Sequence, residues 1–113
     1  DEPQRGSIVT VTNDAWYGQS PGPYQHYAMA RFRAIEQGLP VMRSANTGVS
    51  GAFDALGRQY GPKLPYGTDG ALLLESPAAL ENSTFYARHG QSLFFSTMGL
   101  AFLLFMVLKY RSF

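Results

Sequence analysis

The sequence has no cysteine among its 113 residues. This absence excludes disulfide bonds, zinc sites that use cysteine, and a thiol nucleophile supplied by the chain itself. An excess of one charge is also missing, because nine lysines and arginines offset eight aspartates and glutamates to give a formal net charge of +1. No basic run is present that would follow a phosphate backbone, so nucleic acid is not an expected partner.

Complete catalytic and metal motifs are missing as well. His26 and Glu36 lie ten residues apart on an expected helix and project in different directions, so they make a poor acid–base pair. His26 and His89 have no third ligand at metal spacing. No serine stands in the G-x-S-x-G context of a hydrolase. We therefore expect no metal, no cofactor and no catalytic residue within this chain.

The start of the chain lacks both an initiator methionine and the pattern of a signal peptide. A chain of this length forms one small domain and buries little more than half of its unfolded surface. A lone sheet with one uncovered face would aggregate. We therefore expect a piece of a longer protein, whose upstream part covers the sheet.

The strongest signal is the apolar run at residues 92–108, which has neither charge nor proline. At about 1.5 Å per residue it reaches roughly 25 Å, near the minimum that crosses a bilayer core. A buried helix of a soluble core would keep a polar edge, so the run predicts a membrane span. Lys109 and Arg111 follow it and predict a cytoplasmic C-terminus, although Arg88 and His89 at the other end weaken the asymmetry.

Turn residues divide the rest of the chain. Residues 7–12 alternate as a strand does, whereas residues 23–37 read as a helix that ends at Gly38 and Pro40. One side of this helix is expected to carry Tyr24, Tyr27, Ala28, Arg31, Ala34 and Ile35. Further strands are expected at residues 41–45, 49–54 and 70–74, with a hairpin turn within 54–61. This order predicts a layered α+β domain.

A charged group on and after the expected helix has two interpretations. It can form a solvated face, with Arg33 and Glu36 paired at i,i+3 for a few tenths of a kcal/mol. Alternatively, Arg31 or Arg43 is buried and ties the helix to the sheet through a carboxylate such as Asp14. Breaking such a buried pair would cost about 3–5 kcal/mol.

The segment TNDAWYG at residues 12–18 joins the end of the first strand to a loop. The aromatic side chains of Trp16 and Tyr17 can simply plug this loop. Alternatively, they form the wall of an apolar pocket beside a site, with polar tips suited to a membrane boundary. Both interpretations stay open on the sequence.

Four segments resemble the C-terminal part of bacterial apolipoprotein N-acyltransferases: TNDAWYG at 12–18, GPYQH at 22–26, AMARFRAIEQGLP at 28–40 and RSANTGVS at 43–50. The resemblance runs from about residue 7 to the end, and includes the hairpin at 53–58 and the apolar run. It implies the C-terminal part of a nitrilase-like α-β-β-α sandwich at residues 1–87. One transmembrane helix with a short basic tail follows at 88–113. Soluble nitrilases resemble the chain more loosely and lack the terminal span.

The resemblance implies an enzyme of the bacterial inner membrane, with the sheet domain on the periplasmic side. Such an enzyme moves a fatty acyl chain from a phospholipid to the amino group of a lipoprotein's diacylglyceryl-cysteine. The family uses a Glu, a Lys and a Cys, with a thioester on the Cys. None is placed here, because Lys63 lies in a proline-flanked linker and Glu36 does not fit the base position. The fragment alone should therefore be inactive.

The implied partners are a phospholipid donor, an apolipoprotein acceptor, the lipid bilayer and the upstream part of the same protein. The residues expected on the substrate side are Trp16, Tyr17 and His26. The residues expected to form a loop and core scaffold are Asn13, Asp14, Arg31, Glu36, Arg43 and Asn46; the first two should fix the loop because Asx side chains cap turns. A membrane-tethered amidohydrolase and a non-catalytic membrane-anchored relative remain as alternatives.

Overall fold

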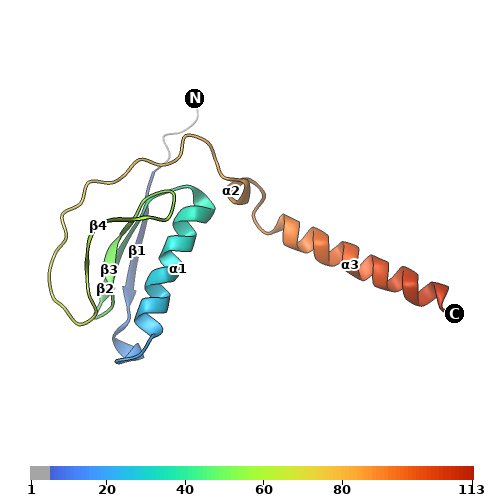
Figure 1. Cartoon of the computed structure of the whole chain (residues 1–113), viewed down its shortest axis with the longest axis horizontal. Coiled ribbons are helices and arrows are strands. Elements are labelled where there is room, and N and C mark those ends of the chain that lie inside the picture. Colours follow the sequence, from blue (N-terminus) through green and yellow to red (C-terminus); the bar gives the residue numbers. More distant parts are fainter. Residues whose placement is uncertain (1–5) are drawn as a thin grey trace.

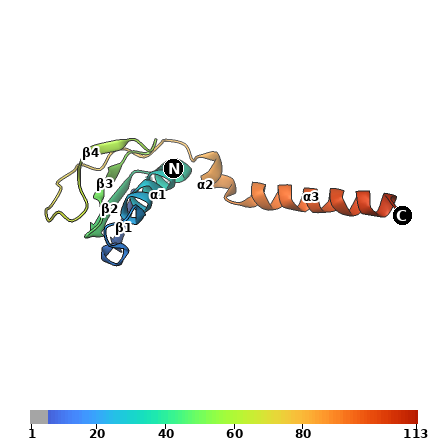
Figure 2. The ribbon, with the colours of Figure 1, turned by 60° about the horizontal axis from the view of Figure 1, so that its bottom comes forward.

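The computed structural model describes residues 6–113, so residues 1–5 of the expected 1–87 domain lie outside it. A four-stranded sheet carries one long helix on one face, and a second long helix projects away from this pair of layers (Figures 1 and 2). The mixed architecture confirms the expected α+β class. The elements are β1 (Ile8–Asn13), η1 (Ala15–Tyr17), α1 (Gly22–Gln37), β2 (Val41–Asn46), β3 (Ser50–Phe53), β4 (Gln59–Leu64), α2 (Phe85–His89) and α3 (Ser92–Arg111).

The strands follow the sequence order β1-β2-β3-β4 across the sheet. β1 and β2 are parallel, in a register that runs from Ile8 opposite Val41 to Asn13 opposite Asn46. Parallel neighbours need a crossover connection, and α1 supplies it. The carboxyl ends of β1 and β2 therefore meet at one edge of the sheet, beside the start of α1. β3 and β4 complete the sheet as antiparallel strands.

The helix α1 begins and ends where its proline and glycine residues predict. Pro23 lies in the first turn, where its missing N–H costs no hydrogen bond. Gly38 ends the helix in the left-handed conformation, at φ 63°, and its N–H bonds the carbonyl of Ala34 at 2.8 Å.

The buried side of α1 differs from the expected one. The expected side included four exposed residues, Tyr24, Ala28, Arg31 and Ile35. The sheet contacts a narrower stripe, at the spacing of one helix face. This stripe consists of Pro23, Tyr27, Ala30 and Ala34.

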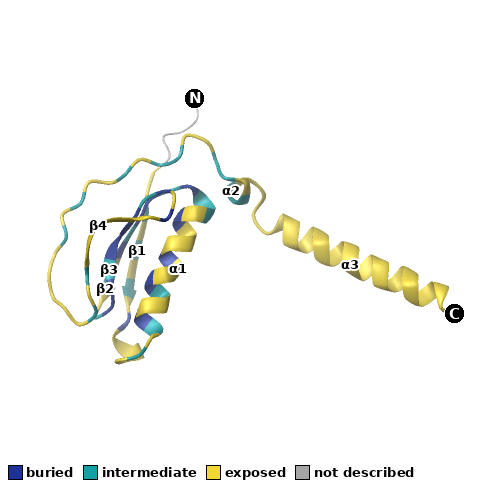
Figure 3. Cartoon of the chain, in the orientation of Figure 1, coloured by how far each residue is buried: buried dark blue, intermediate teal, exposed yellow. Residues whose placement is uncertain are grey.

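The core lies between α1 and the sheet, and the other face of the sheet is exposed along β1. The rings of Tyr27 and Phe53 pack with centroids 4.8 Å apart in this core. On the opposite face, Val9 is 66% exposed and Val11 is 82% exposed (Figure 3). Residues 6–113 thus supply one helix layer and one sheet layer of the expected four-layer sandwich.

The fourth strand is Gln59–Leu64, and the expected strand at residues 70–74 is wrong. A tight turn that starts at Asp54 returns the chain directly beside β3, so the segment just after the turn takes the pairing. Pro62 is tolerated because β4 is an edge strand. Residues 70–74 have no strand pairing, and all of them except Leu73 line, with Val9 and Met42, a cavity of about 470 Å³ on this face of the sheet.

The segment before α3 is held against the C-terminal end of α1. Leu80 donates its N–H to the carbonyl of Gly38 at 3.0 Å. The Thr84 hydroxyl donates to the carbonyl of Glu36 and accepts the N–H of Ala87 at 3.0 Å, which caps α2. The helix α3 follows, is long and apolar enough to cross a membrane, and has no buried residue.

Candidate functional site

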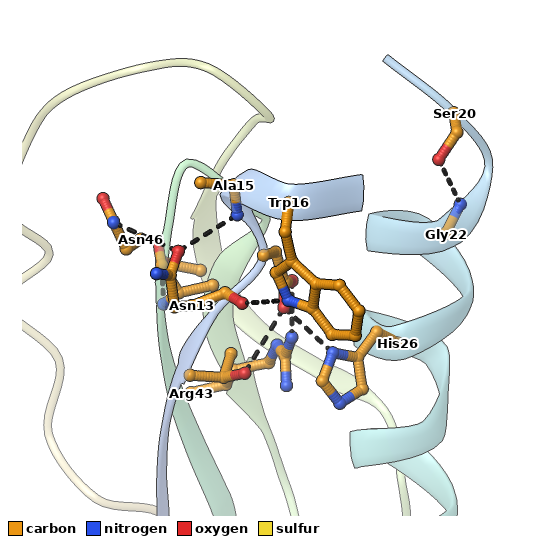
Figure 4. Close-up of polar contacts among 12 residues, drawn as sticks. Asn13, Ala15, Trp16, Ser20, Gly22, His26, Arg43 and Asn46 are labelled. Carbon is orange, nitrogen blue, oxygen red and sulfur yellow. Dashed lines mark hydrogen bonds and ion pairs between the residues drawn. The ribbon is translucent and has the colours of Figure 1, made fainter. Parts of the chain in front are cut away.

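The candidate site lies at the edge where β1 and β2 both end. Asn13 and Asn46 are register partners there, and the loop after β1 leads through η1 into α1 (Figure 4). In sheets with parallel strands, functional side chains gather at the carboxyl ends of the strands. The topology therefore brings together residues from β1, the loop, α1 and β2.

Asp14 is the centre of this site, and its side chain is fully buried. Its Oδ2 accepts a hydrogen bond from Nη2 of Arg43 at 2.8 Å, and its Oδ1 lies 2.9 Å from Nδ1 of His26. A carboxylate can only accept, so the Nδ1–H of His26 is the donor. The Thr12 hydroxyl donates to the same Oδ1 at 3.3 Å. One carboxylate thus ties together β1, α1 and β2.

The structure decides between the two interpretations of the charged residues. The side chain of Arg43 is only 3% exposed and makes the buried ion pair with Asp14, whereas Arg31 is exposed. The structure does not give Arg31 the buried position expected for it, because its side chain is exposed and its stem lies beside the turn at Gly57. Arg33 and Glu36 form the expected i,i+3 pair at 3.2 Å on the surface. Glu36 lies about 15 Å along α1 from His26 and is not part of the site.

The turn between β2 and β3 shapes the site in a way that sequence reasoning missed. Thr47 adopts a left-handed backbone at φ 67°, which is uncommon for a residue with a Cβ branch. A Cβ at Gly48 would collide with the carboxylate of Asp14. The signal available in the sequence was the Asn46-Thr47-Gly48 turn, which marks a bend without revealing what packs against it.

Asn13 fixes the start of the loop through its side chain. Its Oδ1 accepts the N–H of Ala15 at 3.1 Å, which is the Asx turn expected here, and also Nδ2 of Asn46 at 3.2 Å. Its backbone carbonyl accepts the indole N–H of Trp16 at 2.7 Å. The indole is therefore held by its polar end, with its ring free to face outward.

Trp16, Tyr17 and His26 form a row of rings at the surface. The centroids of Trp16 and Tyr17 lie 4.7 Å apart, and those of Tyr17 and His26 lie 6.0 Å apart. Trp16 is 78% exposed, so it does not plug the domain formed by residues 6–113. The row instead presents apolar surface beside the buried carboxylate, and Figure 4 shows two of its members, Trp16 and His26.

Three buried polar atoms near Arg43 have no hydrogen-bond partner within residues 6–113: Arg43 Nε, Thr10 Oγ1 and the Tyr27 hydroxyl. Thr10 is the register partner of Arg43 on β1. Burial raises the pKa of the Tyr27 hydroxyl, and the nearby Arg43 charge opposes this rise. Buried polar groups in native proteins are almost always paired, so these three atoms are exceptions within residues 6–113.

Comparisons with known proteins identify the family. Residues 3–99 match the carbon–nitrogen hydrolase family. The chain is 66% identical over 55 residues to the apolipoprotein N-acyltransferase of Rhizobium rhizogenes, which covers 49% of this chain and 10% of that protein. It is 53% identical over 85 residues to the apolipoprotein N-acyltransferase of Bradyrhizobium diazoefficiens. This aligned region covers 75% of this chain and 16% of that protein. The chain thus spans only a small part of these relatives, but it belongs to the carbon–nitrogen hydrolase family.

Proposed function

We propose that this chain is the C-terminal part of an apolipoprotein N-acyltransferase. The observation that carries the proposal is α3, a wholly exposed apolar helix attached to a domain of the carbon–nitrogen hydrolase family. A hydrolase that acts on water-soluble amides has no need of such a helix, whereas the helix would keep an enzyme with a phospholipid substrate at the membrane. The names of the two relatives described above support the same choice.

The proposed reaction has two acyl-transfer steps. A thiolate outside residues 1–113 attacks the fatty ester of a phospholipid, which forms a thioester and releases a lysophospholipid. The free amino group of a diacylglyceryl-cysteine then attacks the thioester, which forms an amide and restores the thiol. The upstream part of the same protein supplies the Glu, Lys and Cys for these steps, because this chain has no cysteine.

In this reaction, the residues of the candidate site hold the loop in place and present its aromatic rings to the lipid. They do not themselves react. Asp14, held by Arg43 and His26, fixes the loop that carries Trp16 and Tyr17. The exposed rings then offer an apolar surface to the acyl chain or the lipid acceptor. Residues 1–87 form part of the nitrilase-like domain, and 88–113 form the span and its tail.

The proposed location is the bacterial inner membrane, with the sheet domain in the periplasm. Lys109 and Arg111 close the span with positive charge, which favours the cytoplasmic side for the C-terminus. A protease-protection assay with a C-terminal tag tests this placement. The tag should survive in intact spheroplasts and be cleaved once the membrane is opened, and its cleavage in intact spheroplasts would reverse the orientation.

The activity is tested with the complete gene product in detergent, given a phospholipid and a diacylglyceryl-cysteine peptide. The peptide should gain the mass of one acyl chain. Trp16→Ala should lower this transfer by at least about ten-fold, equivalent to ~1.4 kcal/mol, while the amount of folded protein is unchanged. Leu73→Ala is the matched control, because Leu73 is fully exposed in the linker. No peptide product from the unmodified enzyme would refute the proposed function.

A membrane-tethered amidohydrolase is the second candidate, favoured by the family description itself. It would use the same fold and pass the acyl group to water instead of to an amine. The same preparation then hydrolyses small amides and leaves the peptide unmodified. Product on the peptide together with no amide hydrolysis excludes this candidate.

A further inference from the structure

The outer side of α1 carries an apolar stripe that is largely uncovered within residues 6–113, although its last residue, Ile35, lies against the turn at Gly57 between β3 and β4. Met29 is 57% exposed, Phe32 is 60% exposed and Ile35 is 42% exposed, and Ala28 lies one turn before Phe32 on the same side. The opposite side of α1 is buried against the sheet. A helix at the surface of a soluble domain is normally polar on its outer side, but here Gln25 and Glu36 are polar only at the two ends of the stripe. The apolar residues between them therefore favour a second partner for α1.

Positive charge borders this stripe on both sides. Arg31 and Arg33 flank Phe32 in the sequence, and each residue of a helix is rotated by about 100° from the next. The two guanidinium groups therefore project from opposite borders of the stripe, and Arg33 also pairs with Glu36 at 3.2 Å. Apolar residues flanked by arginines are typical of helices that lie in a membrane interface, where the cations reach lipid phosphates.

The position of α3 fixes where a membrane would lie relative to this stripe. Thr84 and Leu80 hold the linker at the C-terminal end of α1, and α3 starts shortly after α2. In both views of the ribbon, α1 lies between the sheet and α3, and α3 projects away on the side of α1 (Figures 1 and 2). The exposed side of α1 is turned away from the sheet (Figure 3). If α3 follows the membrane normal, the outer side of α1 faces the bilayer surface.

We propose that the stripe formed by Ala28, Met29, Phe32 and Ile35 docks on the bilayer interface. The geometry makes α1, about 24 Å long, a second membrane contact beside the span. Two contacts fix the tilt of the sheet domain over the lipid, which one flexible tether cannot do. This inference rests on the proposed membrane span but not on the proposed reaction.

Photo-crosslinking in lipid tests the proposal on the complete gene product. p-Benzoylphenylalanine replaces Phe32 in one variant, Met29 in a second and Val11 in a third, and each protein is placed in nanodiscs of phosphatidylethanolamine and phosphatidylglycerol. Val11 is the matched control, because it is exposed but lies on the sheet face away from α1. A fourth variant at Phe102, in the middle of α3, reports the span itself.

Phospholipid adducts, detected by mass, should form at positions 32 and 29 several-fold more than at position 11. Adducts at position 102 with none at 32 and 29 would overturn the docking proposal and leave the span intact. Crosslinks from position 32 to another segment of the protein would also overturn it, because the stripe would then be covered by protein. If position 102 forms no lipid adduct, α3 does not span the membrane, and the docking proposal fails with it.

Discussion

Two Asp–Arg ion pairs with nearly equal N–O distances have different structural roles in this molecule. Asp14 and Arg43 meet at 2.8 Å, and Asp54 and Arg58 meet at 2.7 Å. The first pair is buried, with side chains 0% and 3% exposed, whereas the Arg58 side chain is 73% exposed. The first joins residues 29 positions apart, and the second joins residues four positions apart. Distance alone therefore does not rank ion pairs, because burial and sequence separation decide what each pair holds.

The environments explain this difference. Around Asp14, removal of either partner leaves a charge stranded away from water, and such a loss costs about 3–5 kcal/mol. The Asp54 carboxylate instead closes one turn, and it accepts the N–H groups of Leu56 and Arg58 as well as the Arg58 side chain. Water can replace much of the interaction between Asp54 and Arg58, and exposed ion pairs contribute roughly 1 kcal/mol or less to stability.

The largest effect is expected for Asp14→Asn. The amide keeps the shape but leaves the Arg43 charge without a buried counter-ion, so the complete gene product should lose about 3–5 kcal/mol of stability. Thermal unfolding in detergent, followed by size-exclusion chromatography of the heated protein, measures the loss. Asp54→Asn is the matched control. The double variant Asp14→Asn/Arg43→Met should recover part of the loss, and equal losses for the two Asp variants would contradict the contrast.

Gly48→Ala should have the next largest effect. The new methyl group would collide with the Asp14 carboxylate, and overpacking of this kind costs about 1–3 kcal/mol. Gly6→Ala is the control, because a Cβ there meets no atom within 4 Å. The same thermal assay reads both variants. Equal stability of the two would mean that the loop moves aside freely, and that the turn does not hold the carboxylate in place.

Asp54→Asn tests the exposed pair through its pH dependence. Burial raises the pKa of the Asp54 carboxyl, but hydrogen bonds from Arg58 and Leu56 and the Arg58 charge outweigh it, so the pKa lies below its ordinary value of 3.8. The carboxylate therefore stabilises the fold above about pH 4, and this contribution is lost as the pH falls through the folded-state pKa.

The variant should be less stable by about 0.5–1 kcal/mol at pH 7, with the difference shrinking towards about pH 3. Unfolding midpoints in urea at several pH values measure the change. Arg58→Gln, which keeps the backbone N–H donor, is expected to reproduce only part of the effect. A difference that grows as the pH falls would have the wrong sign and would refute the assignment.

The sequence predicted what depends on neighbouring residues and missed what depends on distant ones. Pro23 and Gly38 set the ends of α1 locally, so the helix was found nearly to the residue. The apolar run predicted α3 by composition alone. The sequence left open whether Arg31 or Arg43 is the buried arginine. The answer depends on how α1 packs on the parallel pair β1 and β2, which brings Arg43 of β2 to Asp14.

The fourth strand and the shape of the turn after β2 show the same limit. β4 pairs with β3 because the Asp54 turn is tight, and propensity favoured residues 70–74 instead. Gly48 looked like an ordinary turn glycine, and only the fold brings it against Asp14. The substrate-side residues Trp16, Tyr17 and His26 do lie together, but their roles remain predictions that the variants must test.

Tyr27→Phe should have the smallest effect, although the residue is buried beside the same Arg43. Its hydroxyl has no hydrogen-bond partner within residues 6–113, so its removal takes away a polar group and leaves the ring packed on Phe53. Stability should stay within about 1 kcal/mol of the unmodified protein. Thermal unfolding measures it beside Asp54→Asn. A loss larger than that of Asp54→Asn would show that the hydroxyl has a partner elsewhere in the protein, and would extend the buried network around Arg43 beyond this chain.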